Sequence, residues 1–419
     1  MAGEGERLRR ALCGFLIAIG IGLLCVSGFC AGFLNASPQG TRASAGGRLS
    51  LVWEAWSYVE QYFYGAIPDG QELVYGAIDG SLETLGDPYT RLVRPIAHEM
   101  ERDRLRGHFA GIGAYVYEDS ARLYLQPLAD GPAEAAGVQE GDQLLAVDGV
   151  ELPGGATPEL AVAWIRGPLG SVVKIDVYRP STGERLSLAI ERQEIAQPTV
   201  EWAVMDEYRP VVGYIRITLF SERTPVELQR ALASLRRDGA ALLVLDLRAN
   251  PGGLLDSAVE VSSRFLRRGV VLHELLADGT ERRYSVRPRV RANEPMVVLV
   301  DEGTASAAEI VAGALRDHER AELVGQRTRG KGSVQLAYDL SDGSSLHVTS
   351  ALWLTPNRAE IDGVGLAPDH PVDAAEPQTN ADERVPRTNA NEHRGESDPV
   401  LEVGLMVLGV VADCVEAMQ

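Results

Sequence analysis

Two short runs of almost purely apolar residues, 241–247 and 296–300, place the strongest constraint on how this chain can fold. Continuous apolar runs of this length indicate strands that are buried on both faces, which occur mainly in parallel sheets covered by helices. Apolar residues at helical spacing follow each run, over residues 254–265 and 307–316. The alternation predicts an α/β (in the wider sense α+β) core over residues 196–375.

The preceding part of the chain has a different pattern. Residues 107–195 contain short β-rich runs separated by turns with Gly and Pro, and one helical stretch near residues 158–165. They predict a compact, mostly-β module inserted ahead of the α/β core. Residues 48–106 repeat apolar side chains every three or four positions, which predicts a small N-terminal helical region.

The N-terminal end carries an apolar run without any charge, residues 11–34, preceded by Arg7, Arg9 and Arg10. A helix of this length spans a hydrocarbon core of about 30 Å. The run therefore predicts an N-terminal transmembrane helix that anchors the protein, with a cleaved export signal as the alternative. The arginines predict a cytoplasmic n-region at residues 1–10 and a body outside the cytoplasm, in the periplasm or at the cell surface.

Two further segments have the composition of linkers. Residues 35–47 are small and polar, and residues 376–399 are charged with hardly any bulky apolar side chain, which predicts disorder in the latter. Residues 400–419 begin with an apolar stretch, which predicts a C-terminal docking helix.

Composition excludes several classes of function. The chain has 40 basic and 59 acidic residues, a formal net charge of −19, which argues against a nucleic-acid partner. Its cysteines leave residues 31–413 without any, so the folded body has no disulfide framework, thiolate zinc site or cysteine nucleophile. Its histidines form no H-E-x-x-H pattern. We therefore expect neither a metal nor a cofactor.

Three stretches have the features that catalysis requires. The first, DLRANPGG at residues 246–253, follows a buried strand, and its glycines free the backbone to direct N–H groups at a developing oxyanion. The second, DEGTASAAEI at residues 301–310, places Ser306 at a helix N-terminus, where a serine is more often an N-cap than a nucleophile. The third is GKGSVQ at residues 330–335, where Lys331 acts as a base only if burial lowers its pKa.

Together the three stretches resemble the carboxyl-terminal processing peptidases, also called tail-specific proteases. GTASAAEI at residues 303–310 is similar to the family's serine motif, with Thr304 in place of the usual serine. GKGSVQ and LRANPGG match the other two motifs in order and spacing, and DPYT at residues 87–90 is like the family's DPYS. Asn357-Arg-Ala359 departs from the family's Gly-Arg after Thr-Pro. The resemblance covers roughly residues 50–375.

The resemblance implies a serine endopeptidase that uses a Ser–Lys dyad and an acyl-enzyme. Ser306 would be the nucleophile, Lys331 the general base and Gln335 its orienting partner, although an extended chain would keep Gln335 too far from the ammonium. Backbone N–H groups of Gly252, Gly253 and Ala307 would form the oxyanion hole.

Residues 107–195 would be the family's PDZ domain, which binds free apolar C-termini of protein or peptide substrates. Gly111, Ile112 and Gly113 resemble the carboxylate-binding loop of such domains, and Arg166 resembles the arginine that couples the PDZ domain to the protease. In the family both terminal regions help to form homodimers. Asp317 matches a family aspartate, for which we expect a structural role.

Two other functions are open on the sequence. A Ser-His-Asp hydrolase would use His318 or His347, but Ser306 lacks the G-x-S-x-G elbow. A catalytically inactive PDZ-containing scaffold of the same fold is the alternative from another class of protein, although it would have no need of Ser306, Lys331 and Gln335.

Overall fold

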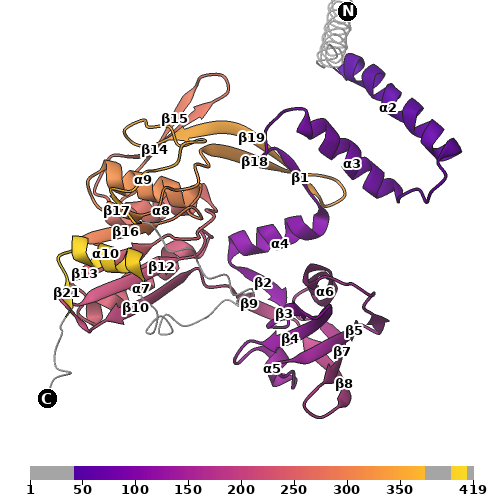
Figure 1. Cartoon of the computed structure of the whole chain (residues 1–419), viewed down its shortest axis with the longest axis horizontal. Coiled ribbons are helices and arrows are strands. Elements are labelled where there is room, and N and C mark those ends of the chain that lie inside the picture. Colours follow the sequence, from indigo (N-terminus) through magenta and orange to yellow (C-terminus); the bar gives the residue numbers. More distant parts are fainter. Residues whose placement is uncertain (1–41, 373–397, 413–419) are drawn as a thin grey trace, which may run out of the picture. The chain divides into compact units, whose positions relative to one another are not determined.

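The computed structural model of the chain describes residues 42–372 and 398–412 (Figure 1). It divides into two units, residues 1–77 and residues 78–419, which are described separately. Helix α2 (Arg42–Tyr62) lies in the first unit, and α3 (Gly70–Glu83) crosses the boundary between them. No helix within the described ranges is both long and apolar enough to span a membrane. The predicted membrane segment at residues 11–34 and most of the linker at residues 376–399 lie outside these ranges.

The mostly-β module is built on an antiparallel sheet with strand order β3-β4-β5-β7-β8. Strand β3 lies at one edge of this sheet. Inward-facing side chains of β7 and β4 pack with α6, so that Leu125, Val173, Ile175, Val177 and Ala161 are fully buried. The elements are β2 (His108–Gly111), β3 (Ala114–Asp119), β4 (Arg122–Pro127), α5 (Pro132–Ala135), β5 (Asp142–Val147), β6 (Val150–Glu151), α6 (Pro158–Ile165), β7 (Val172–Arg179), β8 (Glu184–Glu191) and β9 (Gln193–Ala196).

The α/β core contains a six-stranded sheet with strand order β10-β12-β13-β16-β17-β20. Its neighbouring strands pair in parallel from β12 to β20, and β10 is antiparallel. Every residue of β13 and β16 is buried, as expected for strands covered on both faces. The strands are β10 (Val200–Met205), β12 (Val212–Ile217), β13 (Leu242–Asp246), β16 (Met296–Val300), β17 (Glu322–Gly325) and β20 (His370–Pro371).

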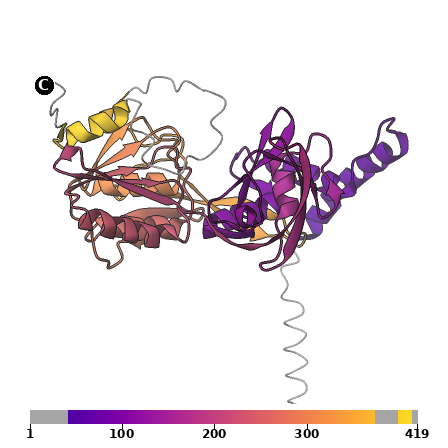
Figure 2. The same ribbon diagram turned by 90° about the horizontal axis from the view of Figure 1, so that it is seen from below.

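Helices cover both faces of this sheet (Figure 2). On one face lie α7 (Thr224–Arg237), α8 (Leu255–Phe265) and α9 (Ala307–Asp317). On the other lies the C-terminal helix α10 (Pro399–Val407), whose Val400 and Leu405 pack on apolar side chains of the strands. Beyond α10, β21 (Val411–Ala412) pairs with β11 (Tyr208–Arg209).

A second sheet carries the lysine motif. Its strand order is β1-β19-β14-β15, with β18 paired to β19 as a long antiparallel hairpin. Helix α4 (Pro95–Arg106) connects β1 to the β module. The strands are β1 (Arg91–Val93), β14 (Val270–Leu276), β15 (Glu281–Ser285), β18 (Ser333–Asp339) and β19 (Ser345–Leu354).

Candidate active site

The candidate site lies at the carboxyl ends of β13 and β16. These two strands are parallel neighbours, so the loops that leave them meet at one edge of the sheet. The loop after β13 carries Asn250, Gly252 and Gly253, and the loop after β16 carries Ser306. A backbone hydrogen bond from Ala305 N to Asn250 O, 2.9 Å, joins the two loops.

Positions 252 and 253 require glycine, because neighbouring atoms lie too close to leave room for a side chain. Both have positive φ, +104° and +134°. A Cβ on Gly252 would lie 2.7 Å from Cβ of Ser306, and one on Gly253 would lie 2.2 Å from the carbonyl oxygen of Phe220. A side chain at either position would therefore displace the loop that packs against the serine.

The predicted oxyanion donors differ in whether their N–H groups are free. The Gly252 N–H donates to Asn250 Oδ1, 2.9 Å, so this group is already used in the structure. The N–H groups of Gly253 and Ala307 have no partner within the described residues. Because Gly252 has no side chain, its loop can pack directly against Ser306.

Ser306 precedes α9 in a strained backbone conformation, with φ 53° and ψ −117°. Positive φ at a residue with a side chain costs about 1–3 kcal/mol and occurs mainly where surrounding structure enforces it. Here the carboxylate of Glu309 accepts a hydrogen bond from Ser306 N, 2.8 Å. The side chain thus begins at the N-terminus of α9, where the unpaired N–H groups favour negative charge.

Glu309 is the residue of this site that the sequence analysis did not single out. Its side chain is fully buried. Besides Ser306 N it accepts hydrogen bonds from Gly330 N, 2.7 Å, from Lys331 N, 2.9 Å, and from Thr328 Oγ1, 2.5 Å. One carboxylate therefore joins the serine loop to the lysine loop. The sequence signal was a charged residue inside the apolar helix 307–315, where a solvated face is not available.

Lys331 is half-buried, its backbone N–H is bonded to the same carboxylate as that of Ser306, and its ammonium lies over the ring of Tyr89. Its Nζ lies 5.0 Å from the ring centroid of Tyr89, a cation–π contact. Burial lowers the pKa of Lys331, the positive charges of Arg91 and Arg329 act in the same direction, and Glu101 opposes them. Within the described part of the chain, no hydrogen bond joins Lys331 Nζ to Ser306.

Tyr89 is held in place by the DPYT turn. Asp87 accepts hydrogen bonds from Tyr89 N, 3.0 Å, and from Thr90 Oγ1, 2.6 Å. Thr90 Oγ1 in turn accepts one from Thr349 N in β19, 3.0 Å. The turn is thus fixed to the hairpin that begins just after Lys331.

Gln335 lies in β18, and the chain from Lys331 to Gln335 is extended rather than helical. Its Nε2 donates to Ser333 Oγ, 2.9 Å, and to Thr349 Oγ1, 3.5 Å. The extended alternative considered from the sequence therefore applies, and within the described residues no hydrogen bond joins Gln335 to the ammonium of Lys331.

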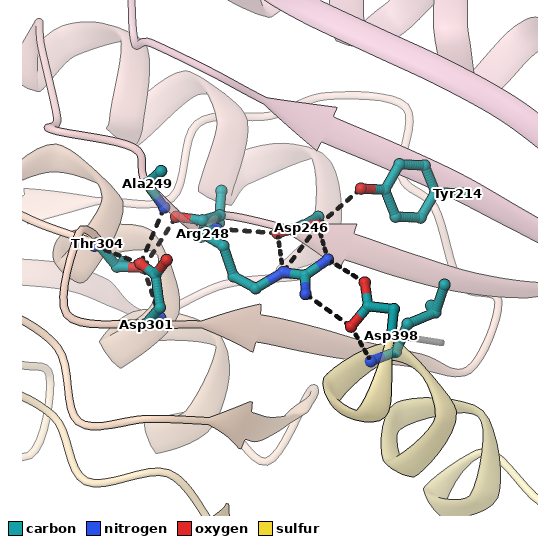
Figure 3. Close-up of polar contacts among 9 residues, drawn as sticks. Tyr214, Asp246, Arg248, Ala249, Asp301, Thr304 and Asp398 are labelled. Atoms are coloured by element: carbon teal, nitrogen blue, oxygen red, sulfur yellow. Dashed lines mark hydrogen bonds and ion pairs between the residues drawn. The ribbon is translucent and has the colours of Figure 1, made fainter. Parts of the chain in front are cut away.

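A charged cluster joins the loop after β13 to the start of α10 (Figure 3). Arg248 forms two hydrogen bonds with the carboxylate of Asp398, each 2.9 Å, and further ones with Asp246. Asp246 also accepts from Tyr214 Oη, 2.6 Å. Burial disfavours the charge on Arg248, but the two carboxylates outweigh it and raise its pKa. Asp398 is at the same time the N-cap of α10 and accepts from Leu401 N.

The β module presents the predicted carboxylate loop beside its edge strand β3. Ile112 is buried, and the carbonyls of Ile112 and Gly113 accept from Ala133 N, 2.7 Å, and Leu128 N, 2.9 Å. Gly113 has φ +68° and packs against Pro132. Because of these bonds, the carbonyl groups of Ile112 and Gly113 point into the β module.

Arg166 ends α6 and is mostly buried. Its Nη1 donates to Asp103 Oδ2 in α4, 2.6 Å, and its guanidinium lies 4.6 Å above the ring of Phe109. It is therefore not a solvated helix-end arginine, and it joins the β module to α4.

Neither histidine of the Ser-His-Asp alternative forms a hydrogen bond with Ser306 within the described residues, and Asp317 makes a structural contact. His318 caps the far end of α9 and contacts Val270 O, 2.8 Å, about 18 Å from Ser306 along the helix. His347 lies on β19 near Glu101, 3.7 Å. Asp317 accepts from Asn357 N, 2.9 Å, a contact that fixes the chain segment after Thr355-Pro356.

Comparison with known proteins identifies both parts of the fold. Residues 211–372 match peptidase family S41, and residues 124–179 match the PDZ domain. The chain is 37% identical over 323 residues to a carboxyl-terminal-processing protease of Synechocystis sp., covering 76% of this chain and 75% of the relative. It is 36% identical over 338 residues to the carboxy-terminal processing protease CtpA of Bacillus subtilis, covering 80% and 71%. The solved photosystem II D1 C-terminal processing protease is 31% identical, covers 76% of this chain and 86% of its own, and has a TM-score of 0.46.

An α/β core with a PDZ domain and a serine at the carboxyl edge of its sheet defines a class of peptidase, and the chain belongs to peptidase family S41. Its function is that of a carboxyl-terminal-processing serine protease, an endopeptidase that acts on peptide substrates.

Proposed function

We propose that Ser306 and Lys331 form the catalytic dyad of this protease. The observation that carries the assignment is the buried carboxylate of Glu309, which accepts hydrogen bonds from the backbone N–H groups of both residues. The loop after β16 and the loop between β17 and β18 are thereby held at a fixed separation. The lowered pKa of Lys331 supports its role as a base, since a neutral amine is needed to accept a proton.

In the proposed reaction, Ser306 Oγ gives its proton to the neutral Lys331 Nζ and bonds to the scissile carbonyl carbon. The tetrahedral intermediate collapses when the C–N bond breaks and the leaving amine takes the proton from Lys331. A water molecule then loses a proton to Lys331 and attacks the ester. Breakage of the ester returns that proton to Ser306 and releases the new carboxyl terminus.

The free N–H groups of Gly253 and Ala307 are the proposed oxyanion donors. A donor of this kind contributes about 2.7–4 kcal/mol to the transition state in known cases. Gly252, whose N–H bonds to Asn250, acts by allowing the loop to approach Ser306.

Assembly of the dyad requires a hydrogen bond between Ser306 Oγ and Lys331 Nζ, which in the present arrangement lies 5.0 Å from the centroid of the Tyr89 ring. Gln335, which contacts Ser333 and Thr349 in the present arrangement, would then orient the amine. We propose that the structure corresponds to a resting arrangement of the site.

Substrate recognition is assigned to the PDZ domain. A peptide strand added beside the edge strand β3 would place its terminal carboxylate at Gly111, Ile112 and Gly113. The buried Ile112 favours apolar terminal residues. Arg166, through Asp103 of α4, is the proposed connection from this domain toward the peptidase core.

The remaining assignments concern the whole chain. We propose a transmembrane anchor at residues 11–34 with the body outside the cytoplasm, a homodimer, and no nucleic-acid partner, based on the apolar run, the family resemblance and the net charge of −19. The proposed domains are the helical region 48–106, the PDZ domain 107–195, the peptidase core 196–375 and the C-terminal segment 400–419.

Covalent labelling with a fluorophosphonate, which reacts with activated serines, tests the dyad on the full chain. We expect labelling of the wild type at Ser306, none for Ser306→Ala, and strongly slowed labelling for Lys331→Ala. Thermal unfolding of both variants serves as the folding control. Labelling of Lys331→Ala at the wild-type rate would show that another group activates the serine.

A further inference from the structure

A pocket lined almost entirely by arginines lies at the C-terminal end of α8. This helix begins just after the catalytic loop, and its 11 residues put its other end about 16 Å away. The pocket has a volume of ≈ 590 Å³. Its lining residues come from the turn after α8 and from the segment after β15: Leu266, Arg267, Arg268, Arg287, Pro288, Arg289 and Arg291.

Only part of this positive charge is balanced by neighbouring carboxylates. Arg287 bonds to Asp256, 2.6 Å, and to Glu260, 2.9 Å, and Arg289 bonds to Glu260, 2.7 Å. Arg267 and Arg268 are exposed, and neither has an ion pair within the described residues. Five arginines against two carboxylates leave about three positive charges around one pocket, in a chain whose net charge is −19.

A second observation points to an absent ligand. Nη1 of Arg291 is buried and has no hydrogen-bond partner in the described structure. Buried donors in native proteins are nearly always satisfied, so Arg291, a lining residue of the pocket, has a hydrogen-bond donor that the described residues leave unused. The crowding of charge also affects Arg264 behind the pocket, where burial and the positive charge of Arg289 lower the pKa.

We propose that this pocket binds a phosphate-bearing anion with at least two negative charges. Planar guanidinium groups pair bidentately with phosphate oxygens, and several of them surround one pocket here. A single carboxylate would neutralise only about a third of the excess charge. The only apolar lining residues, Leu266 and Pro288, offer little to an apolar ligand. A small phosphate compound and the headgroup of an anionic phospholipid share this chemistry.

Titration calorimetry of the full chain with pyrophosphate tests the site. The test variant combines Arg267→Gln with Arg268→Gln, because both side chains are exposed and unpaired, so their loss does not disturb folding. The matched control combines Arg122→Gln with Arg185→Gln, which removes the same charge from exposed positions on the PDZ domain. We expect saturable binding by the wild type and the control, and binding weakened roughly tenfold or more in the test variant, since two guanidinium groups without a carboxylate partner are removed. Peptidase activity should be equal in all three proteins.

Vesicles distinguish the two sources of phosphate. Flotation with phosphatidylcholine vesicles, with and without cardiolipin, whose headgroup carries two phosphate groups, compares the wild type with the test variant, which has the same N-terminal segment. A cardiolipin preference that the test variant loses assigns the site to a lipid headgroup, and pyrophosphate binding without that preference assigns it to a free phosphate compound. The proposal is overturned if neither is observed, or if the test variant binds pyrophosphate as well as the wild type.

Discussion

At the scale of single residues, the catalytic edge contains groups that destabilise the fold. Lys331 is an ammonium that burial and the neighbouring Arg91 and Arg329 disfavour. Ser306 has a backbone conformation that costs about 1–3 kcal/mol. Such costs are typical of sites that were selected for chemistry rather than for stability.

Lys331→Met should abolish turnover and raise the melting temperature near neutral pH. The lysine has a lower pKa in the folded protein than the 10.5 of the unfolded chain, so folding is opposed while the folded lysine is charged. This penalty is full below the folded pKa and disappears as pH rises toward 10.5. The stability difference between Lys331→Met and the wild type should therefore shrink with rising pH in thermal scans. A variant less stable than the wild type at neutral pH would contradict this.

The same pKa predicts the pH dependence of activity. Wild-type turnover should rise with pH as Lys331 becomes neutral, with an apparent pKa below 10.5 and no inflection that belongs to histidine near 6.5. Lys331→Arg should be inactive at every pH, because guanidinium keeps its proton, a loss of about 10²–10⁴-fold or more. Turnover of a peptide measured from pH 6 to pH 10 checks both, and an active Lys331→Arg would eliminate lysine as the base.

Glu309→Gln should lower both stability and turnover. The carboxylate accepts from Ser306 N, Gly330 N, Lys331 N and Thr328 Oγ1, whereas a carboxamide has one oxygen and an NH₂ that would face a donor. We expect a loss of about 1–3 kcal/mol in urea unfolding and a fall in kcat with little change in KM. Thr328→Val, which removes one donor to the carboxylate and the acceptor of the Leu366 N–H but keeps the charge of Glu309, is the comparison variant. Wild-type kcat in Glu309→Gln would show that the shared carboxylate does not position the dyad.

The sequence predicted the residues of the candidate site more fully than their contacts. Ser306, Lys331 and the glycine loop could be proposed because each follows a buried strand or lies in a glycine-rich turn. Two sets of contacts could not be predicted: the hydrogen bond from Gly252 N to Asn250 Oδ1 and the partners of Gln335. They depend on side-chain packing across segments distant in the chain. Glu309 was visible only as a charge in an apolar helix.

At the scale of secondary structure, elements with a strong period matched the structure closely. Residues 254–265 were predicted as a helix, and α8 is Leu255–Phe265; residues 307–316 were predicted, and α9 is Ala307–Asp317. The β18–β19 hairpin could not be predicted from the sequence. Its strands are half-exposed with mixed side chains, so neither a period of two nor a continuous apolar run identifies them.

The contact between Arg248 and Asp398 should hold α10 on the sheet. Asp398→Asn keeps an N-cap for α10 but removes the charge that pairs with the mostly buried Arg248, so we expect a loss of about 1–3 kcal/mol. Amide hydrogen exchange across Pro399–Val407 should accelerate in this variant. Asp398→Ala, which also removes the cap, should exchange faster still. Unchanged exchange in Asp398→Asn would mean that apolar packing alone holds the helix.

At the scale of the whole molecule, the PDZ domain is joined to α4 through the Arg166–Asp103 pair. Coupling between two sites requires a contact that differs between the bound and free states. The Arg166–Asp103 pair is a candidate for such a contact, and substitution of either residue removes it.

Arg166→Ala and Asp103→Asn should each lower turnover about fivefold or more without changing the affinity of the PDZ domain for a terminal peptide. Arg185→Ala on the exposed strand β8 is the control. Peptides with an amidated C-terminus should bind more weakly than the free acids, because the carboxylate is lost. Fluorescence anisotropy gives the affinities and a cleavage assay the turnover. Full activity of both variants, with equal cleavage of amidated and free peptides, would reduce the PDZ domain to a passive tether.

The shared carboxylate of Glu309 also determines which parts of the site can move. While Ser306, Gly330 and Lys331 all donate to it, the two main chains travel together and their separation stays constant. Nζ can then approach Oγ only by rotation about the bonds of the lysine side chain, away from Tyr89 and into another rotamer. Such rotations take picoseconds to nanoseconds, whereas domain movements take microseconds to milliseconds. The dyad can therefore assemble through a fast change of the lysine rotamer, without any rearrangement of the backbone around the serine.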